Sequence, residues 1–110
     1  MYASLIIPSY NACERLYYNL ISLDYQDCDF EKFEVIVIDN GSIDNTYEML
    51  SNINVKYKLE IIYLNKNMGR AFARNIGIKK SKGDILIFHD SDMIAFNDYV
   101  SKHLLYQKDK

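Results

Sequence analysis

Hydrophobic residues gather in four short runs, and segments with helix-like periodicity separate them. Each run is nearly continuous and rich in Ile and Val, which is typical of strands that are buried on both faces of a sheet. The predicted strands cover residues 3–7, 33–38, 59–64 and 84–88. The first strand is expected to end at Pro8. The third alternates between polar and apolar residues near its start, which predicts a position at the edge of the sheet.

Between the strands, apolar residues recur every three or four positions, the spacing of an amphipathic helix. The predicted helices cover residues 14–23, 46–53, 68–80 and about 97–106. Asn11 is a candidate N-cap for the first of these helices and Asp44 for the second. The alternation predicts an α/β fold, namely a Rossmann-like, doubly wound and mostly parallel sheet with helices on both faces. Residues 1–110 are expected to form a single domain.

Charge and cysteine content exclude several functions. The chain of 110 residues has 13 Lys and Arg against 15 Asp and Glu, so its net charge of -2 gives no sign of nucleic-acid binding. Cys13 and Cys28 form no CxxC pair, and both are expected to stay reduced. The N-terminal segment has no basic region and its apolar run is broken at Pro8, so neither a signal peptide nor a membrane span is predicted. The expected location is the cytoplasm or the cytoplasmic face of a membrane.

The predicted topology indicates where a ligand would bind. In an open parallel sheet, ligands bind beyond the carboxyl ends of the strands. Polar and turn-forming residues follow each predicted strand, at positions 8–11, 39–42, 65–69 and 89–92. These segments are therefore expected to meet at one edge of the sheet.

Asp90, Ser91 and Asp92 directly follow the last predicted strand. Two carboxylates one residue apart lie on the same side of a strand and repel each other unless a cation lies between them. Their hard oxygen atoms suit Mg²⁺ or Mn²⁺, which bind through one or two carboxylates and substrate phosphates. The alternative interpretation is a turn that caps the following helix.

Three further residues near the strand ends are candidates. Asp39 can accept a hydrogen bond from a ribose hydroxyl or a base N–H, or it can cap its own turn. The ring of Tyr10 can stack on a base, or it can pack at the rim of the core. His89 precedes the acidic pair, so strand alternation points it away from Asp90. It is predicted to be packed or hydrogen-bonded rather than a metal ligand.

The segment 67–77 combines glycines, arginines and small side chains. Gly69 stands at a predicted helix start, where backbone N–H groups favour an anion. Arg70 and Arg74 share a helix face, where they can offset the nearby carboxylates, bind phosphate or simply remain solvated. The small residues predict close packing of this helix on the sheet: Ala71, Ala73 and Gly77.

Taken together, these segments resemble the family 2 glycosyltransferases with the GT-A fold. SLIIPSYNACERLYYNLISL is similar to that family's first strand and helix, and VIVIDNGSIDNT to its second strand and Asp-bearing turn. NKNMGRAFARNIGIKKSKGDILIFHDSDMI is similar to its Asn-x-Gly…Ala-Arg-Asn…Gly helix followed by a DxD motif. The motifs appear in the family's order across nearly the whole chain.

The resemblance implies an enzyme that transfers a sugar from a nucleotide-diphospho-sugar to an acceptor, with a UDP-sugar as the expected donor and Mn²⁺ or Mg²⁺ as the cofactor. It implies these site residues: Pro8, Ser9 and Tyr10 in the wall of the nucleotide pocket, Asp39 at the base, Arg70 near the base or diphosphate, Asp90 at the ribose or metal, Ser91 beside the nucleotide, and Asp92 on the metal.

The chain is shorter than the enzymes it resembles, whose second half supplies the acceptor site and the catalytic base. No catalytic base is therefore predicted among these residues. The chain is expected to be the nucleotide-binding half, to bind a donor weakly and to transfer little by itself. The edge beside the fourth strand is expected to be open, so a homodimer through that edge is plausible.

Three other classes of protein share part of this pattern. A HAD-type phosphatase needs further lysine and acidic motifs downstream, and a receiver domain needs an acidic pair where this chain has Pro8, Ser9 and Tyr10. A non-catalytic nucleotide-binding or assembly module that keeps the fold stays open. Metal-dependent UDP binding would favour a transferase, whereas dimerisation without nucleotide binding would favour the module.

Overall fold

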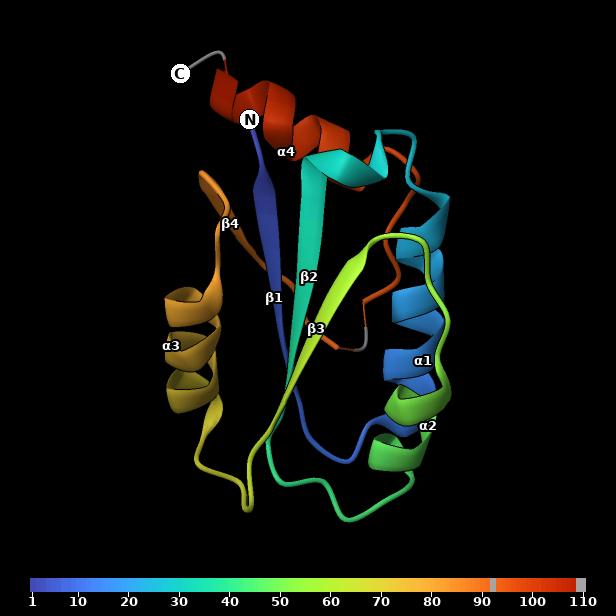
Figure 1. Cartoon of the computed structure of the whole chain (residues 1–110), viewed down its shortest axis with the longest axis vertical. Helices are drawn as coiled ribbons and strands as arrows, with labels where there is room; N and C mark the ends of the chain where they lie inside the picture. The colour runs from blue at the N-terminus through green and yellow to red at the C-terminus, as the bar shows by residue number, and fades with distance from the viewer. Residues whose placement is uncertain (92, 109–110) are drawn as a thin grey trace.

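The structure, a computed structural model, describes residues 1–91 and 93–108. Its described strands form one four-stranded sheet in the order β3-β2-β1-β4 (Figure 1), and every neighbouring pair is parallel. The strands are β1 (Ala3–Ser9), β2 (Phe33–Asp39), β3 (Lys58–Tyr63) and β4 (Ile85–Phe88). The predicted Rossmann-like α/β fold and the edge position of the third strand are confirmed.

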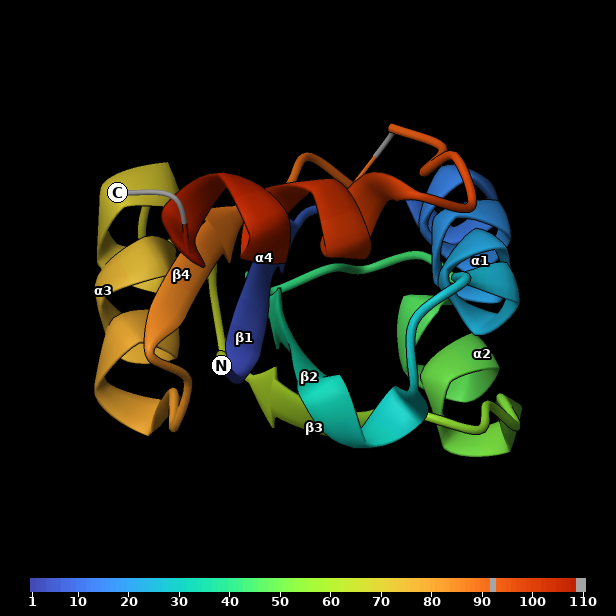
Figure 2. The same ribbon diagram turned by 90° about the horizontal axis from the view of Figure 1, so that it is seen from above.

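Helices cover both faces of the sheet, as the sequence predicted. Figure 2 shows α3 on one face, and α1 and α2 on the other. Their bounds are α1 (Cys13–Ser22), α2 (Thr46–Asn52), α3 (Arg70–Lys80) and α4 (Tyr99–Lys108), and two short 3₁₀ helices cover Leu23–Tyr25 and Phe30–Lys32. Each predicted helix exists, and the bounds differ by one or two residues at most ends.

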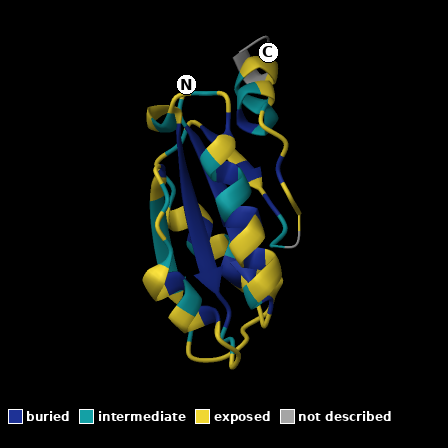
Figure 3. Ribbon diagram, turned by 90° about the vertical axis from the view of Figure 1, so that its right-hand side faces the viewer, coloured by how far each residue is buried: buried dark blue, intermediate teal, exposed yellow. Residues whose placement is uncertain are grey.

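The two faces of the sheet bury two separate hydrophobic clusters. Every residue of β1 and β2 is buried, and successive side chains point to opposite faces. Ile6 and Ile36 pack with Ala73 under α3, whereas Leu5 and Val35 pack on the side of α1 and α2. Figure 3 shows the buried strands between helices whose outer faces are exposed. Burial of one such side chain stabilises the fold by about 1.5–3 kcal/mol.

The predicted end of the first strand at Pro8 is wrong, because β1 continues to Ser9 and Pro8 pairs with Ile38. Proline lacks an N–H donor, which normally excludes it from a central strand. Backbone groups of Ile6 face β4, since its carbonyl accepts from His89 N at 3.0 Å. Pro8 faces the same way two residues later, beyond the last β1–β4 pair at Phe88. Its missing N–H therefore costs no ladder hydrogen bond.

The predicted N-cap at Asn11 is also wrong, because Ala12 occupies that position of α1 and makes no side-chain cap. Asn11 has a φ of 49°, and its Oδ1 accepts from Ile43 N at 2.9 Å. The first turn of α1 is instead capped from a distant segment, since Cys13 N donates to Asp44 Oδ2 at 3.3 Å. Asn45 holds the N-cap position of α2 and makes no side-chain cap, but Asp44, one residue earlier, accepts from Thr46 N through Oδ1 at 3.0 Å. Asp44 therefore satisfies the first N–H of α2, as predicted, without holding the N-cap position.

A buried glutamine, Gln26, is hydrogen-bonded to the backbone at the N-terminal end of α4. Gln26 Nε2 donates to Phe96 O at 2.7 Å, and Gln26 Oε1 accepts from Val100 N at 2.9 Å. Val100 is fully buried against the α1 side of the sheet. These contacts fix where the chain runs after the last strand.

Within the described residues, β4 forms the second edge of the sheet. Its Leu86 and Phe88 are exposed, while Ile85 and Ile87 are buried. Pairing of a second copy along this edge stays a prediction. Cys13 and Cys28 are free, as expected. No helix in the described part of the chain has the length and apolar character required to cross a bilayer.

Replacement of Gly77 by valine is expected to destabilise the fold. A Cβ at Gly77 would lie 2.5 Å from Ile6 Cγ2 and 3.0 Å from Ile38 Cδ1, and overpacking of this kind costs about 1–3 kcal/mol. The control is Ala71→Val on the same helix, because Ala71 is exposed, contrary to its predicted packing. The control should cost only about half a kcal/mol through helix propensity. Equal free energies of urea unfolding for the two variants would contradict close packing at Gly77.

The capping role of Asp44 predicts a stability that depends on pH. Burial raises the pKa of Asp44, but hydrogen bonds from Thr46 and from Cys13 N outweigh it and lower the pKa below 3.8. The stabilisation is therefore present above that pH and is lost as pH falls through the folded value. Asp44→Ala should lower the free energy of urea unfolding by about 1 kcal/mol at pH 7. The difference from wild type should shrink below pH 4, and a difference that is constant with pH would contradict an ionised cap.

Candidate nucleotide and metal site

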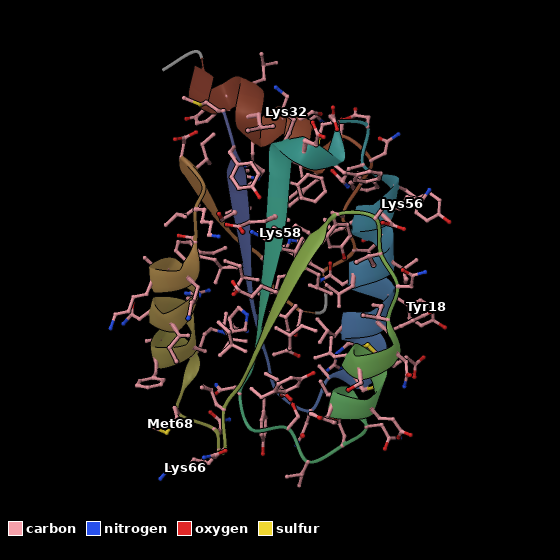
Figure 4. The ribbon with its side chains drawn as sticks, in the orientation of Figure 1. Tyr18, Lys32, Lys56, Lys58, Lys66 and Met68 are labelled. Atoms are coloured by element: carbon pink, nitrogen blue, oxygen red, sulfur yellow. The ribbon has the colours of Figure 1, made fainter. Side chains whose placement is uncertain are left out.

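A pocket of about 310 Å³ opens where the strands end and α3 begins. Lys66 and Met68, labelled in Figure 4, mark the turn before α3 at the same end of the sheet. Nine residues line the pocket: Pro8, Ser9, Tyr10, Ala12, Arg15, Asn40, Asn67, Arg70 and Ser91. Five of them were predicted from the sequence. The pocket brings together segments that lie more than eighty residues apart, since both Pro8 and Ser91 line it.

Ser9 and Tyr10 follow the end of the central strand. The Ser9 side chain is only 3% exposed, and its Oγ has no hydrogen-bond partner among the described residues. A buried hydroxyl without a partner is costly unless a ligand or water satisfies it. Tyr10 is 45% exposed, so its ring is available for stacking.

Asp39 does not line this pocket. Its carboxylate is buried and Oδ1 accepts from Ser42 N at 3.2 Å, which is the turn-capping arrangement. The next turn residue, Gly41, has a φ of +78°, and a Cβ there would lie 2.4 Å from the backbone of Lys66. Only glycine permits both the conformation and the close approach. The turn after β2 therefore lies directly against the turn before α3.

Asn40 connects these two turns through its buried amide. Its Nδ2 donates to Gly69 O at 3.2 Å, and its Oδ1 accepts from Met68 N at 2.9 Å. Asn67 Oδ1 accepts from Gly69 N at 2.8 Å, and Gly69 has a φ of +90°. These bonds fix the entry into α3 and so the position from which Arg70 projects.

Arg70 extends from the first position of α3 toward the last strand. Its Nη1 lies 3.4 Å from Asp90 Oδ1, and both side chains are partly exposed, at 59% and 43%. The prediction that Arg70 offsets a carboxylate is confirmed for Asp90. Arg74 instead lies over the ring of Phe88, with 5.5 Å between Cζ and the ring centroid. Its Nε has no partner among the described residues.

Hydrogen bonds to a buried histidine hold the segment that follows β4. His89 is 1% exposed and bonded to Asn19, Tyr99 and Met93 O, which confirms a packed, hydrogen-bonded histidine. Burial lowers the pKa of His89, so the ring is neutral at pH 7. Asp92 lies outside the described residues.

The described residues offer few ligands for a divalent cation. The described residues contain no cluster of three or more His, Cys, Asp or Glu that would form a complete cage. Asp90 is not among the residues that line the pocket, but its partly exposed carboxylate pairs with Arg70, which does line it. Mg²⁺ and Mn²⁺ sites that use substrate phosphates need only one or two carboxylates from the protein, so the described residues fit this kind of site.

Sequence reasoning missed four lining residues: Ala12, Arg15, Asn40 and Asn67. Asn40 and Asn67 lie in the predicted strand-end segments 39–42 and 65–69, and the capacity of asparagine to bond neighbouring backbone groups is a signal for them. Arg15 had no such signal, because it is an exposed position of an ordinary amphipathic helix.

Comparison with known proteins gives a consistent family. The chain is 52% identical over 104 residues to the uncharacterized glycosyltransferase YfnE of Bacillus subtilis, covering 94% of this chain and 26% of that protein. It matches a crystal structure of Staphylococcus aureus TarS residues 1–349 in complex with UDP, with a TM-score of 0.90 and 29% identity. That match covers 99% of this chain and 32% of the TarS chain.

A third match shows the fold alone. The mannosyltransferase PcManGT of Pyrobaculum calidifontis, in complex with GDP-Man and Mn²⁺, has a TM-score of 0.83 at 23% identity, over 93% of this chain and 31% of that chain. The chain thus spans about a quarter to a third of the length of these proteins.

The sequence model of Glycosyl transferase family 2 matches residues 4–110. This range contains every strand end that contributes to the pocket. The fold, the relatives and the matched range agree, and the chain belongs to the family 2 glycosyltransferases.

Proposed function

We propose that these 110 residues form the donor-binding half of a glycosyltransferase that uses a nucleotide-diphospho-sugar and a divalent metal. The observation that carries the proposal is the shared pocket, which combines an exposed aromatic ring, an unpartnered buried hydroxyl and an arginine beside a carboxylate. Nucleotide diphosphates offer matching groups, namely a flat base, ribose hydroxyls and an anionic diphosphate. TarS, whose structure contains UDP, supports a uridine nucleotide.

The nucleoside is proposed to bind at the ends of β1 and β2. Tyr10 is placed to stack on the base, and Ser9 Oγ can donate to or accept from a ribose or base atom. Asp39 is proposed to accept from the base N–H. Since Asp39 Oδ1 already accepts from Ser42 N, its other carboxylate oxygen would serve the base.

The diphosphate and metal are proposed to lie between Arg70, Asp90 and Ser91, with Asp92 as a further metal ligand. A bound Mn²⁺ or Mg²⁺ would stabilise the negative charge that develops on the leaving diphosphate. Arg70 can move from Asp90 to a phosphate oxygen, because an exposed ion pair contributes only about 0–1 kcal/mol. Arg15 lines the same pocket and can add a second positive charge.

The acceptor site and catalytic base are not assigned to the described residues. The chain is therefore proposed to bind a donor but to transfer little sugar by itself. The alternative, a nucleotide-binding or assembly module without activity, predicts no metal-dependent UDP affinity.

Calorimetric titration of UDP into the protein, with and without Mn²⁺, tests the donor site. Asp90→Asn should lower the Mn²⁺-dependent affinity about tenfold or more, because a lost charged contact costs roughly 1.5–3 kcal/mol. The control is Asp84→Asn, which changes the same charge at the other end of β4, where Asp84 bonds Tyr2 N. The control should bind as wild type does. A folded wild-type protein that gives no heat under either condition would contradict the proposal and favour the module.

The role of Arg70 can be tested with a charge-matched pair of variants on one helix. Arg70→Gln should weaken UDP binding about tenfold if the guanidinium contacts the diphosphate. Lys79→Gln removes the same charge from the last turn of α3, where Lys79 is exposed. It should change the affinity less than about twofold, because salt screens distant surface charges. Equal losses in the two variants would indicate a general electrostatic effect rather than a phosphate contact.

A further inference from the structure

A series of buried hydrogen bonds lies next to the segment that carries Asp90. Asn19 from α1, His89 from the end of β4 and Tyr99 from the start of α4 are its members. The Asn19 and His89 side chains are 0% and 1% exposed. A buried asparagine on an otherwise apolar helix face is costly unless its amide is satisfied, and Asn19 is fully used.

The contacts fix the orientation of the Asn19 amide. Its Nδ2 lies 2.8 Å from Asp90 O and 3.2 Å from Ser91 O. Both partners are carbonyl oxygens, which only accept, so the amino group of Asn19 must face them. The carbonyl Oδ1 then faces His89, at 2.8 Å from Nε2.

The same reasoning fixes the tautomer of His89. Its Nε2 faces two acceptors, Asn19 Oδ1 and Met93 O at 3.1 Å, so Nε2 carries the hydrogen. Its Nδ1 lies 3.0 Å from Tyr99 Oη and accepts from that hydroxyl. One orientation of the Asn19 amide and one tautomer of His89 therefore satisfy all the hydrogen bonds that link Asn19, His89 and Tyr99.

These bonds act on the backbone of the candidate metal segment rather than on its side chains. The Asn19 amide holds two successive carbonyl groups, and Met93 N closes the turn on Asp90 O at 3.2 Å. The direction of the Asp90 carboxylate depends on that backbone. A leucine at position 19 would fill a similar volume but would leave both carbonyl groups without this donor.

We propose that Asn19, oriented by His89 and Tyr99, is a positioning residue that holds the Asp90–Ser91 backbone in the conformation that binds the metal and diphosphate of the donor. The inference rests on the proposed function for its ligand. Its structural part, that the Asn19 amide holds the Asp90 and Ser91 carbonyl groups, does not depend on any ligand.

The first measurement needs no ligand. Nitrogen-15 NMR of the histidine ring should show the Nε2–H tautomer for His89 in the wild-type protein. Amide exchange at Met93 should be faster in Asn19→Leu than in wild type, relative to strand amides of β1. An Nδ1–H tautomer, or Met93 protection that is unchanged in a folded variant, would overturn the inference.

The second measurement uses Mn²⁺ and UDP as probes. Asn19→Leu should weaken Mn²⁺ binding in the presence of UDP about 10–100-fold, as expected for a lost outer-shell contact. UDP binding without Mn²⁺ should fall by a smaller factor, because Asn19 acts on the pocket only through Ser91, whereas other segments hold Ser9, Tyr10 and Arg70. The control is Ser4→Ala, which removes a buried bond to Glu34 at the other end of the sheet. It should lower stability without changing Mn²⁺ affinity.

Tyr99→Phe provides a milder variant if Asn19→Leu does not fold. Loss of the hydroxyl leaves the buried His89 Nδ1 without its donor, while Nε2–H keeps its two acceptors, so the ring is held by fewer bonds and Mn²⁺ affinity should fall by a smaller factor in the same direction. Wild-type protein that binds Mn²⁺ and UDP, with unchanged Mn²⁺ affinity in the folded variants, would overturn this inference alone. Wild-type protein that does not bind Mn²⁺ and UDP would overturn the proposed function and the ligand part of this inference together.

Discussion

The pairing of β1 with a parallel strand on each side is the constraint on which the site depends. Ser9 pairs with Asp39 on one side, while pairing with β4 ends at Ile6 and Phe88. β4 therefore ends short of the carboxyl ends of β1 and β2. Ser91, three residues after Phe88, lines the pocket together with Pro8. The pocket follows from this difference in strand length, since parallel strands bring their carboxyl ends to one edge.

The groups behind the pocket are buried and hydrogen-bonded, whereas the charged pair at its rim is partly exposed. Asn40 and Asn19 are buried and use their amides on backbone atoms of the two flanking turns. Arg70 and Asp90 at the rim share only one partly exposed ion pair. A weak pair of this kind holds both charges near the pocket and would separate at little cost if the proposed phosphate or metal ion bound there.

The sequence predicted those features that follow from local periodicity. Continuous apolar runs identified the strands, and alternation placed His89 away from Asp90. Features that depend on distant parts of the chain were missed or wrong. Pro8 extends β1 because β4 stops short of it, and Asn11 bonds another turn instead of capping α1. Arg15 reaches the pocket only because α1 packs beside the strand ends, and no pattern around Arg15 signals that placement.

Substitutions at the site fall into two classes. Some change partly exposed side chains at the rim, such as Arg70, and others change buried side chains that support the turns, such as Asn19. A change at the rim, such as one at Arg70, removes a partly exposed group that contributes little to folding, so affinity for the proposed donor should fall while stability stays nearly constant. A change at a support such as Asn19 removes a donor from the Asp90 and Ser91 carbonyl groups, so stability and affinity for the proposed donor should fall together. A plot of affinity against free energy of unfolding would place the two classes on different lines. Side chains that contact the ligand and side chains that hold its binding turns can thus be told apart without a bound complex.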